Sequence, residues 1–106
     1  MTVIKRDGTT VEFDRNKIVV ALKKANDAVE PEERITDNQI EAIADYISEK
    51  KKDRILVEDI QDMVEYKLMQ LDKFALAKAY IIYRYNRALV RKANTTDDSI
   101  LSLIKN

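Results

Sequence analysis

The chain has 106 residues, its 19 lysines and arginines are balanced by 19 aspartates and glutamates, and it contains neither cysteine nor histidine. These absences exclude a disulfide framework, a thiolate or imidazole metal site, a cysteine nucleophile and a Ser-His-Asp triad. The length fits one compact domain with a single core, and no apolar stretch is as long as a membrane span or a signal peptide. We therefore expect a cytoplasmic domain that is not an enzyme by itself.

The composition indicates a mainly helical fold with a β-hairpin at its start. A single glycine and a single proline argue against a sandwich or a barrel, because those folds need many turns. The exception is residues 1–13, where two β-prone stretches flank Asp7-Gly8, the dipeptide preferred in a two-residue type I′ turn. In the register that this turn predicts, Ile4 opposes Val11 on the apolar face, and Val3 lies on the other face.

Two amphipathic helices are predicted to follow. Asp14 is a good N-cap for a helix that fades near Asn26. After an acidic loop at residues 30–33, the segment from Thr36 to Gln39 has the pattern of a capping box and predicts the start of a second helix. The apolar stripes at helical spacing are Ile18, Ala21, Leu22 and Ala25 in the first helix and Ile40, Ile43, Ala44 and Ile47 in the second.

The second half of the chain predicts a short strand and two more helices. Residues 54–57 are apolar and partly β-branched, which favours a third strand beside the hairpin. A third helix is expected from near Glu58, and a fourth, capped by Asp72, from near Lys73 to Ala93. Residues 94–106 have the composition of a linker or tail, so we expect the folded domain to be residues 1–93.

The last predicted helix is basic, with six basic residues and no acidic one between Lys73 and Lys92. The arginines that share one of its faces are Arg84, Arg87 and Arg91, and Tyr80 and Tyr83 lie one turn before the first two. Guanidinium groups suit phosphate and tyrosine rings stack on bases, so this helix is suited to a nucleotide or a nucleic acid. The alternative is structural, because cations stabilise a helix C-terminus and tyrosines pack in cores.

Three cations near the N-terminus allow two interpretations. Lys5 and Arg6 precede the tight turn, where a mobile hairpin could close them over a polyanion such as a triphosphate. They could equally protect an edge strand from aggregation. Lys17 lies in the first turn of the first helix, where the helix dipole disfavours a cation unless an anion binds there. In the second interpretation no anion binds there, and Lys17 is an ordinary exposed lysine.

The order of these motifs resembles the ATP-cone, the nucleotide-sensing domain of ribonucleotide reductases and of the repressor of their genes. The matching segments are residues 3–8, 11–14, 17–18, 57–61 with Val64 and Leu68, and 79–84 with Arg87. The resemblance as a whole spans residues 2 to about 92. The tail at residues 94–100 is similar to the segment after the cone in the anaerobic, glycyl-radical class of ribonucleoside-triphosphate reductase.

The resemblance implies an α+β, mainly α fold, in which a four-helix bundle is covered by a small β-sheet and the hairpin is a lid over ATP or dATP. It also implies allosteric regulation without hydrolysis, in which the domain switches the catalytic domain of a ribonucleotide reductase on or off. Mg²⁺ would be held through the triphosphate rather than by protein ligands. The oligomeric state would depend on the nucleotide.

The resemblance assigns the nucleotide site to particular residues. Phosphate contacts fall on Lys5, Arg6 and Lys17, the adenine and ribose pocket falls near Val3, Ile18, Val57 and Gln61, and the last helix contributes Tyr83, Arg84 and Arg87. Aerobic relatives often carry Thr and His at the positions of Val57 and Gln61, so the ribose contact stays open. Binding of one or of two nucleotides also stays open.

Three other functions remain as alternatives. A small helical nucleic-acid-binding domain would use the basic last helix, although the zero net charge argues against it. A pure oligomerisation module would self-associate without nucleotide. The cone of the gene repressor would follow a cysteine-rich zinc ribbon, and this chain has no cysteine.

Overall fold

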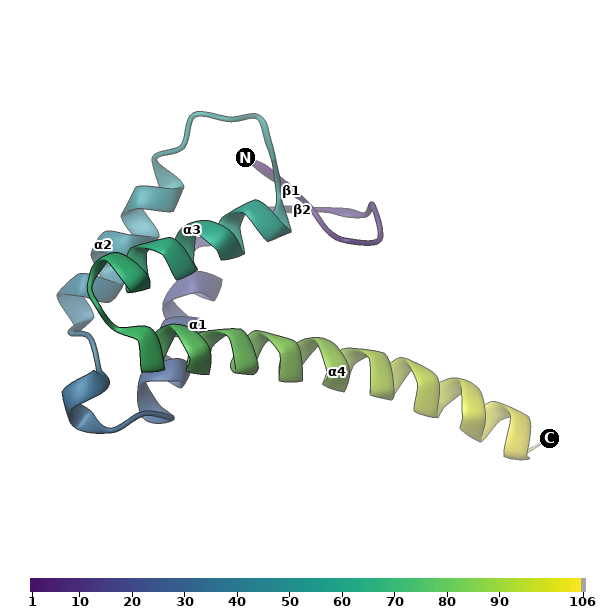
Figure 1. The fold of residues 1–106 in the computed structure, drawn as a ribbon. Coiled ribbons are helices and arrows are strands. Elements are labelled where there is room, and N and C mark those ends of the chain that lie inside the picture. The colour runs from purple at the N-terminus through teal and green to yellow at the C-terminus, as the bar shows by residue number, and fades with distance from the viewer. Residues whose placement is uncertain (106) are drawn as a thin grey trace.

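The computed structural model describes the backbone of residues 1–105 and the side chains of residues 1–90, so the side chain of Arg91 lies outside the described residues. The elements in chain order are β1 (Thr2–Ile4), β2 (Thr10–Glu12), α1 (Arg15–Asp27), a 3₁₀ turn (Pro31–Glu33), α2 (Asp37–Ser48), β3 (Arg54–Leu56), α3 (Val57–Gln70) and α4 (Phe74–Lys105). The predicted α+β, mainly α fold is confirmed (Figure 1).

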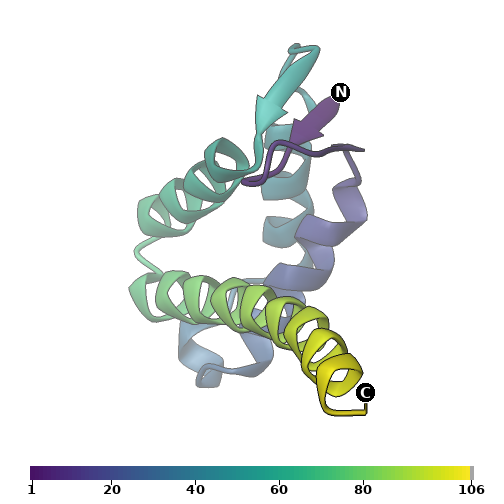
Figure 2. The ribbon, with the colours of Figure 1, turned by 90° about the vertical axis from the view of Figure 1, so that its right-hand side faces the viewer.

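The three strands form one small mixed sheet at one end of the helices (Figure 2). The strand order is β2-β1-β3, with β1 antiparallel to β2 and parallel to β3. The third strand predicted beside the hairpin is therefore confirmed. Because β3 continues directly into α3, the sheet places the hairpin next to the first turn of that helix.

The hairpin register differs by one residue from the prediction. Val3 pairs with Val11, and Val3 is buried in the core, whereas Ile4 pairs with Thr10. The reason is the turn. A type I′ turn needs a positive φ at both central residues, but Gly8 is the residue of this turn with a positive φ, 87°, and its N–H donates to the Lys5 carbonyl oxygen at 3.0 Å. The loop is thus one residue longer, and the faces of the strand before it are exchanged.

The first two helices begin where the capping pattern predicts. The Asp14 carboxylate accepts a hydrogen bond from the Asn16 N–H at 3.0 Å and caps α1. Thr36 and Gln39 form the complete capping box of α2, with both reciprocal hydrogen bonds present. The predicted stripe of α2 is fully buried, and in α1 Val19 joins the core while Ala21 is partly buried.

Asp72 ends α3 rather than capping α4. Its φ is 57°, its N–H donates to the Met69 carbonyl oxygen, and the Lys73 N–H donates to the Leu68 carbonyl oxygen, which is the hydrogen-bond pattern of a Schellman motif. Aspartate tolerates the left-handed conformation better than most residues, so it can replace the usual glycine there. α4 therefore begins at Phe74.

α4 also runs further than predicted, to Lys105 instead of Ala93. The sequence after the 3₁₀ turn contains no glycine and no proline, so it lacks the residues that most strongly end a helix. As a result, α4 projects beyond the packed part of the domain (Figure 1).

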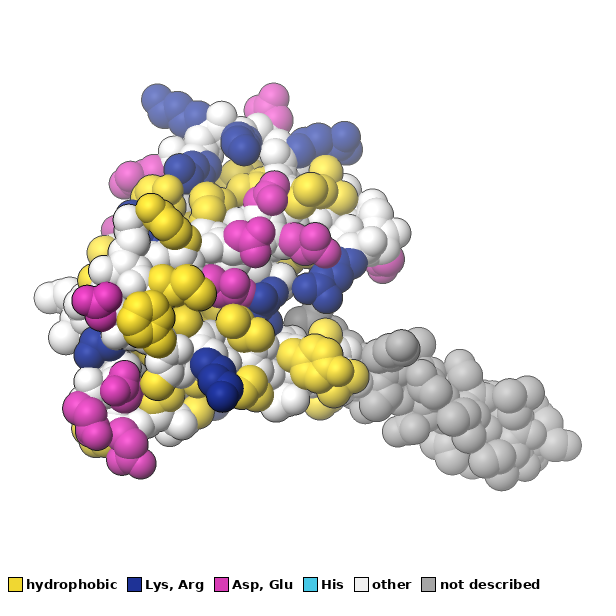
Figure 3. Space-filling view, in the orientation of Figure 1, with side chains coloured by type: hydrophobic (Ala, Val, Ile, Leu, Met, Phe, Trp, Pro, Cys, Tyr) yellow, Lys and Arg dark blue, Asp and Glu magenta, His cyan; other side chains and the backbone are white. Residues whose placement is uncertain are grey.

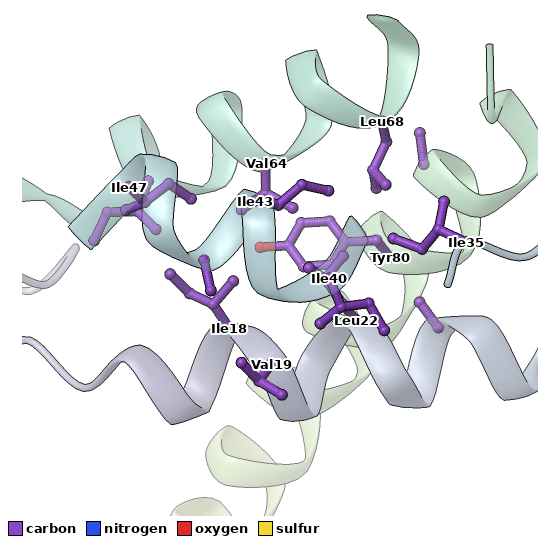
Figure 4. Close-up of a cluster of buried hydrophobic side chains, with 14 of the residues drawn as sticks. Ile18, Val19, Leu22, Ile35, Ile40, Ile43, Ile47, Val64, Leu68 and Tyr80 are labelled. Carbon is purple, nitrogen blue, oxygen red and sulfur yellow. The ribbon is translucent and has the colours of Figure 1, made fainter. Parts of the chain in front are cut away.

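The core lies between all four helices and the inner face of the sheet. It contains side chains from every helix and from β1 and β3. The Tyr80 ring, which is 4% exposed, sits in the middle of this cluster (Figure 4). Tyr80 therefore joins the core while its helix continues past the core toward the hairpin side of the molecule.

Candidate functional site

The hairpin turn and the first halves of α3 and α4 meet at a cluster of polar side chains. The Gln61 Oε1 atom accepts hydrogen bonds from Arg6 Nη2 at 3.4 Å and from Arg84 Nη1. Three residues that are far apart in the sequence, each predicted to be in the site, are thus brought together by direct contacts. Figure 3 shows basic side chains between α3 and α4, with acidic side chains beside them along α3.

Two carboxylates complete this cluster. Glu58 forms an ion pair with Arg6, with 3.2 Å between Arg6 Nε and Glu58 Oε1, and Glu65 forms an ion pair with Arg84. The two pairs differ in environment, because the side chains of Arg6 and Glu58 are 62% and 61% exposed and those of Arg84 and Glu65 are 22% and 17% exposed. The Arg84–Glu65 attraction is therefore the less screened of the two.

Arg84 also has an unused donor. Its Nε atom is buried and forms no hydrogen bond within the described part of the chain. Its guanidinium carbon lies 5.7 Å from the centroid of the Tyr80 ring. Burial raises the pKa of Tyr80 to about 12, an effect that the Arg84 charge opposes and the Glu65 charge reinforces. Arg84 is thus a partly buried cation with donor capacity left for an anion.

The other predicted cations lie around this cluster. Lys5 closes the hairpin turn through its backbone, since its N–H donates to the Thr9 carbonyl oxygen at 2.7 Å. Lys17 is exposed in the first turn of α1, a turn without an acidic residue. Arg87 is exposed one turn after Arg84 on the same face of α4. The hydrogen bonds and ion pairs described above join Arg6 to Arg84 through Gln61 and include none of these three side chains.

The remaining predicted site residues are buried or partly buried and line no open pocket. Val3 and Ile18 are each 6% exposed and belong to the core. Val57, the first residue of α3, is partly buried and packs against the core, and Tyr83 is also partly buried. A nucleotide would have to displace side chains or the hairpin to reach Val3 or Ile18.

Sequence reasoning missed Glu58 and Glu65. A signal for them exists, because Glu58, Gln61 and Glu65 lie at i, i+3 and i+7 and so share one face of α3. That spacing places two carboxylates on either side of a residue already assigned to the site. Their arginine partners could not be read from the spacing, since they lie on other elements.

Two surface hollows lie on other faces of α3. One of about 210 Å³ lies between α2 and α3 and includes Tyr46 and Lys67, and one of about 430 Å³ includes Lys52 and Asp62. Gln61 and Glu65 line neither hollow. Among the described residues, no group of three acidic side chains is placed to hold a metal ion. Nor does that part of the chain contain a helix both long and apolar enough to cross a membrane.

The fold and the cluster define a small α+β domain in which two neighbouring arginines, Arg6 and Arg84, are placed to bind an anion. The ATP cone domain family matches residues 1–89, so the chain belongs to this family. The membership supports a nucleotide-sensing regulatory role, and it confirms the resemblance seen in the sequence.

Several relatives of this chain are ribonucleotide reductases. The chain is 38% identical to the alpha subunit of ribonucleoside-diphosphate reductase of Chlamydia muridarum, covering 95% of this chain and 11% of that protein. It is also 38% identical to the vitamin B12-dependent ribonucleoside-diphosphate reductase of Thermoplasma acidophilum, over 85% of this chain and 12% of that protein. The anaerobic ribonucleoside-triphosphate reductase of Haemophilus influenzae is also 38% identical, over 85% of this chain and 13% of that protein. The chain therefore spans about a tenth of the length of these relatives.

Proposed function

We propose that this domain binds ATP and dATP, with Mg²⁺ held through the triphosphate, and thereby switches a ribonucleotide reductase on or off without hydrolysing the nucleotide. The observation that carries the proposal is the joining of Arg6 and Arg84 through Gln61 in a chain of the ATP cone family. The reductase names of the relatives support the proposed partner, and residues 94–106 would lead toward its catalytic domain.

The phosphates are proposed to bind between the hairpin turn and the start of α1. Arg6 and Lys5 lie in the turn, and Lys17 lies in the first turn of α1, where the positive end of the helix dipole adds to its charge. Arg84 would approach from α4 with its unpaired Nε donor. Planar guanidinium groups pair well with phosphate oxygens, so two arginines and two lysines suit a triphosphate.

Discrimination between ATP and dATP requires a contact that senses the ribose 2′-hydroxyl. Gln61 is the neutral polar side chain of the cluster and lies one turn after Val57 on α3, which supports its assignment to the ribose. A coupling of about 1–3 kcal/mol between nucleotide and reductase states would suffice for regulation, and one hydrogen bond can supply a difference of that size.

The signal is proposed to leave the domain through α4 and to change its association with another protein surface. Exposed apolar side chains lie on the face of α4 away from Arg84, and they are Phe74, Ile82, Tyr85 and Leu89, at 61%, 48%, 62% and 46% exposure. An apolar stripe of this kind favours contact with another protein. A second copy of the domain or the catalytic domain of the reductase could supply that surface.

Calorimetric titration with ATP, dATP and GTP in Mg²⁺ tests the binding. We expect both adenine nucleotides to bind at micromolar concentration or tighter and GTP to bind much more weakly. Lys5→Ala, Lys17→Ala and Arg84→Ala should each weaken binding by about 1–3 kcal/mol, the range for a charge-assisted contact. Lys78→Ala is the matched control, because Lys78 is exposed on α4 away from Arg84.

Two results would contradict the proposal. Unchanged affinity in all three site variants would refute the site, and absence of heat with every nucleotide would refute the function. In the second case, binding to DNA of any sequence with a steep salt dependence would identify the basic helix as a nucleic-acid surface. Light scattering on the same samples reports whether the oligomeric state changes with dATP.

A further inference from the structure

The polar cluster forms a continuous chain of contacts across three elements. Glu58 contacts Arg6, Arg6 and Arg84 share the Gln61 side-chain oxygen, and Arg84 contacts Glu65. The two outer members are negative, the two arginines are positive and the bridging residue is neutral. The net charge of this chain of side chains is therefore zero, although both of its arginines are proposed to bind the triphosphate.

We propose that the Glu58 and Glu65 carboxylates occupy the arginines in place of phosphate. Their contacts hold the hairpin against α3 and α4 until a nucleotide displaces the two carboxylates. We call the five residues of the cluster the carboxylate latch. The inference rests on the proposed function for the identity of the displacing ligand, but not for the latch itself.

Competition follows from the donor geometry of arginine. Arg84 already directs Nη1 to Gln61 and Nη2 to Glu65, and its Nε is buried, so a phosphate must displace a partner and move the side chain to gain a bidentate contact. Once displaced, Glu65 would lie unpaired beside a polyanion. Like charges brought together in a partly buried site are unfavourable, so Glu65 lowers the affinity for any triphosphate.

The same contacts fix the position of the hairpin tip. Residues 6–10 are exposed, and a Cβ atom added at Gly8 would meet no atom within 4 Å, so little packing holds the tip in place. Arg6 links the tip to α3 through Glu58 and Gln61. Loss of these contacts would release the tip, and phosphate binding to Arg6 would re-attach it around the ligand.

Isosteric removal of each carboxylate charge tests the competition. We expect Glu65→Gln to bind Mg²⁺–ATP about tenfold more tightly and Glu58→Gln about twofold more tightly, because a partly buried pair matters more than an exposed one. Inorganic tripolyphosphate, titrated in parallel, should show the same gains. Glu49→Gln is the control for net charge, since Glu49 is exposed at the end of α2 and outside the latch. Unchanged or weaker binding in Glu65→Gln, for both probes, would overturn the competition.

Hydrogen exchange without nucleotide tests the latch by itself. The amides of Lys5 and Gly8 are hydrogen-bonded within the turn, and they should exchange severalfold faster in the Glu58→Gln/Glu65→Gln double variant than in the wild type or in Glu49→Gln. Equal exchange rates would overturn the latch. If ATP bound no better than tripolyphosphate while the exchange rates rose, the nucleotide-sensing function would fail and the latch would stand.

Discussion

The buried Tyr80 makes the stability of the domain depend on alkaline pH. Its ring lies in the core, and burial raises the pKa of the hydroxyl to about 12 from the ordinary value of about 10. The neutral Tyr80 hydroxyl is thus favoured over the phenolate more strongly in the folded state than in the unfolded state. The resulting stability is fully present below pH about 10 and is lost as the pH rises through about 12.

The size of this effect follows from the shift. A difference of about two pKa units corresponds to about 2–3 kcal/mol at most, and about 2 kcal/mol of it should be lost by pH about 12. That loss is a large fraction of the typical stability of a small domain, about 5–15 kcal/mol. Alkaline pH acts on the whole protein, so the wild type alone cannot isolate the contribution of Tyr80.

Tyr80→Phe isolates the titration because it keeps the ring and removes only the hydroxyl. Urea unfolding of both proteins at pH about 8 and about 12 gives the loss of unfolding free energy for each. We expect the wild type to lose about 2 kcal/mol more than Tyr80→Phe over this interval. Equal losses in the two proteins would refute the reasoning, and would mean that the Tyr80 hydroxyl is hydrated in the folded domain.

Two further predictions concern the ends of local elements, and urea unfolding at neutral pH checks both. Gly8→Ala should destabilise the domain by about 1 kcal/mol, because a φ of 87° is strained for a residue with a side chain, even though no neighbour lies within 4 Å. An unchanged urea midpoint of unfolding would mean that the turn relaxes. Thr36→Ala should cost about 1 kcal/mol through loss of the α2 capping box, with Thr10→Ala on the exposed hairpin edge as control. Equal losses in the two threonine variants would contradict a specific role of the cap.

The elements that depend on near neighbours could be predicted from the sequence. Asp14, Thr36 and Gln39 cap their helices because the hydrogen bonds concerned join residues two or three positions apart. The stripe from Ile40 to Ile47 is buried as its spacing predicts. These features need no information from the rest of the fold.

The hairpin register could not be predicted because two turns compete for the same dipeptide. Asp7-Gly8 fits a type I′ turn, but it also fits a longer loop in which Gly8 alone has a positive φ, as found here. Pairing of Val3 with Ile55 of β3, and the burial of both, favours the second turn. Ile55 lies 52 residues after Val3, so local sequence does not contain the deciding contact.

The candidate site was likewise predicted in part, and the missing part depends on contacts between distant elements. The family resemblance assigned Arg6, Gln61 and Arg84 to one site, and the structure joins them by hydrogen bonds. The partners Glu58 and Glu65 were missed because acidic residues are numerous in this chain, with 19 in total, and their pairing depends on how α3 packs against α4 and the hairpin.

The two faces of α4 offer a route from the site to a partner surface. Arg84 faces Gln61 and Glu65 on α3, while Tyr85, the next residue, is 62% exposed on the outer face. Because a helix moves as a rigid element, exchange of Glu65 for phosphate at Arg84 would shift the outer face together with the inner one. A regulatory domain needs only such a displacement, provided that the ligand favours one of the two positions. The carboxylate latch supplies the second position, since it holds Arg84 when no anion is bound.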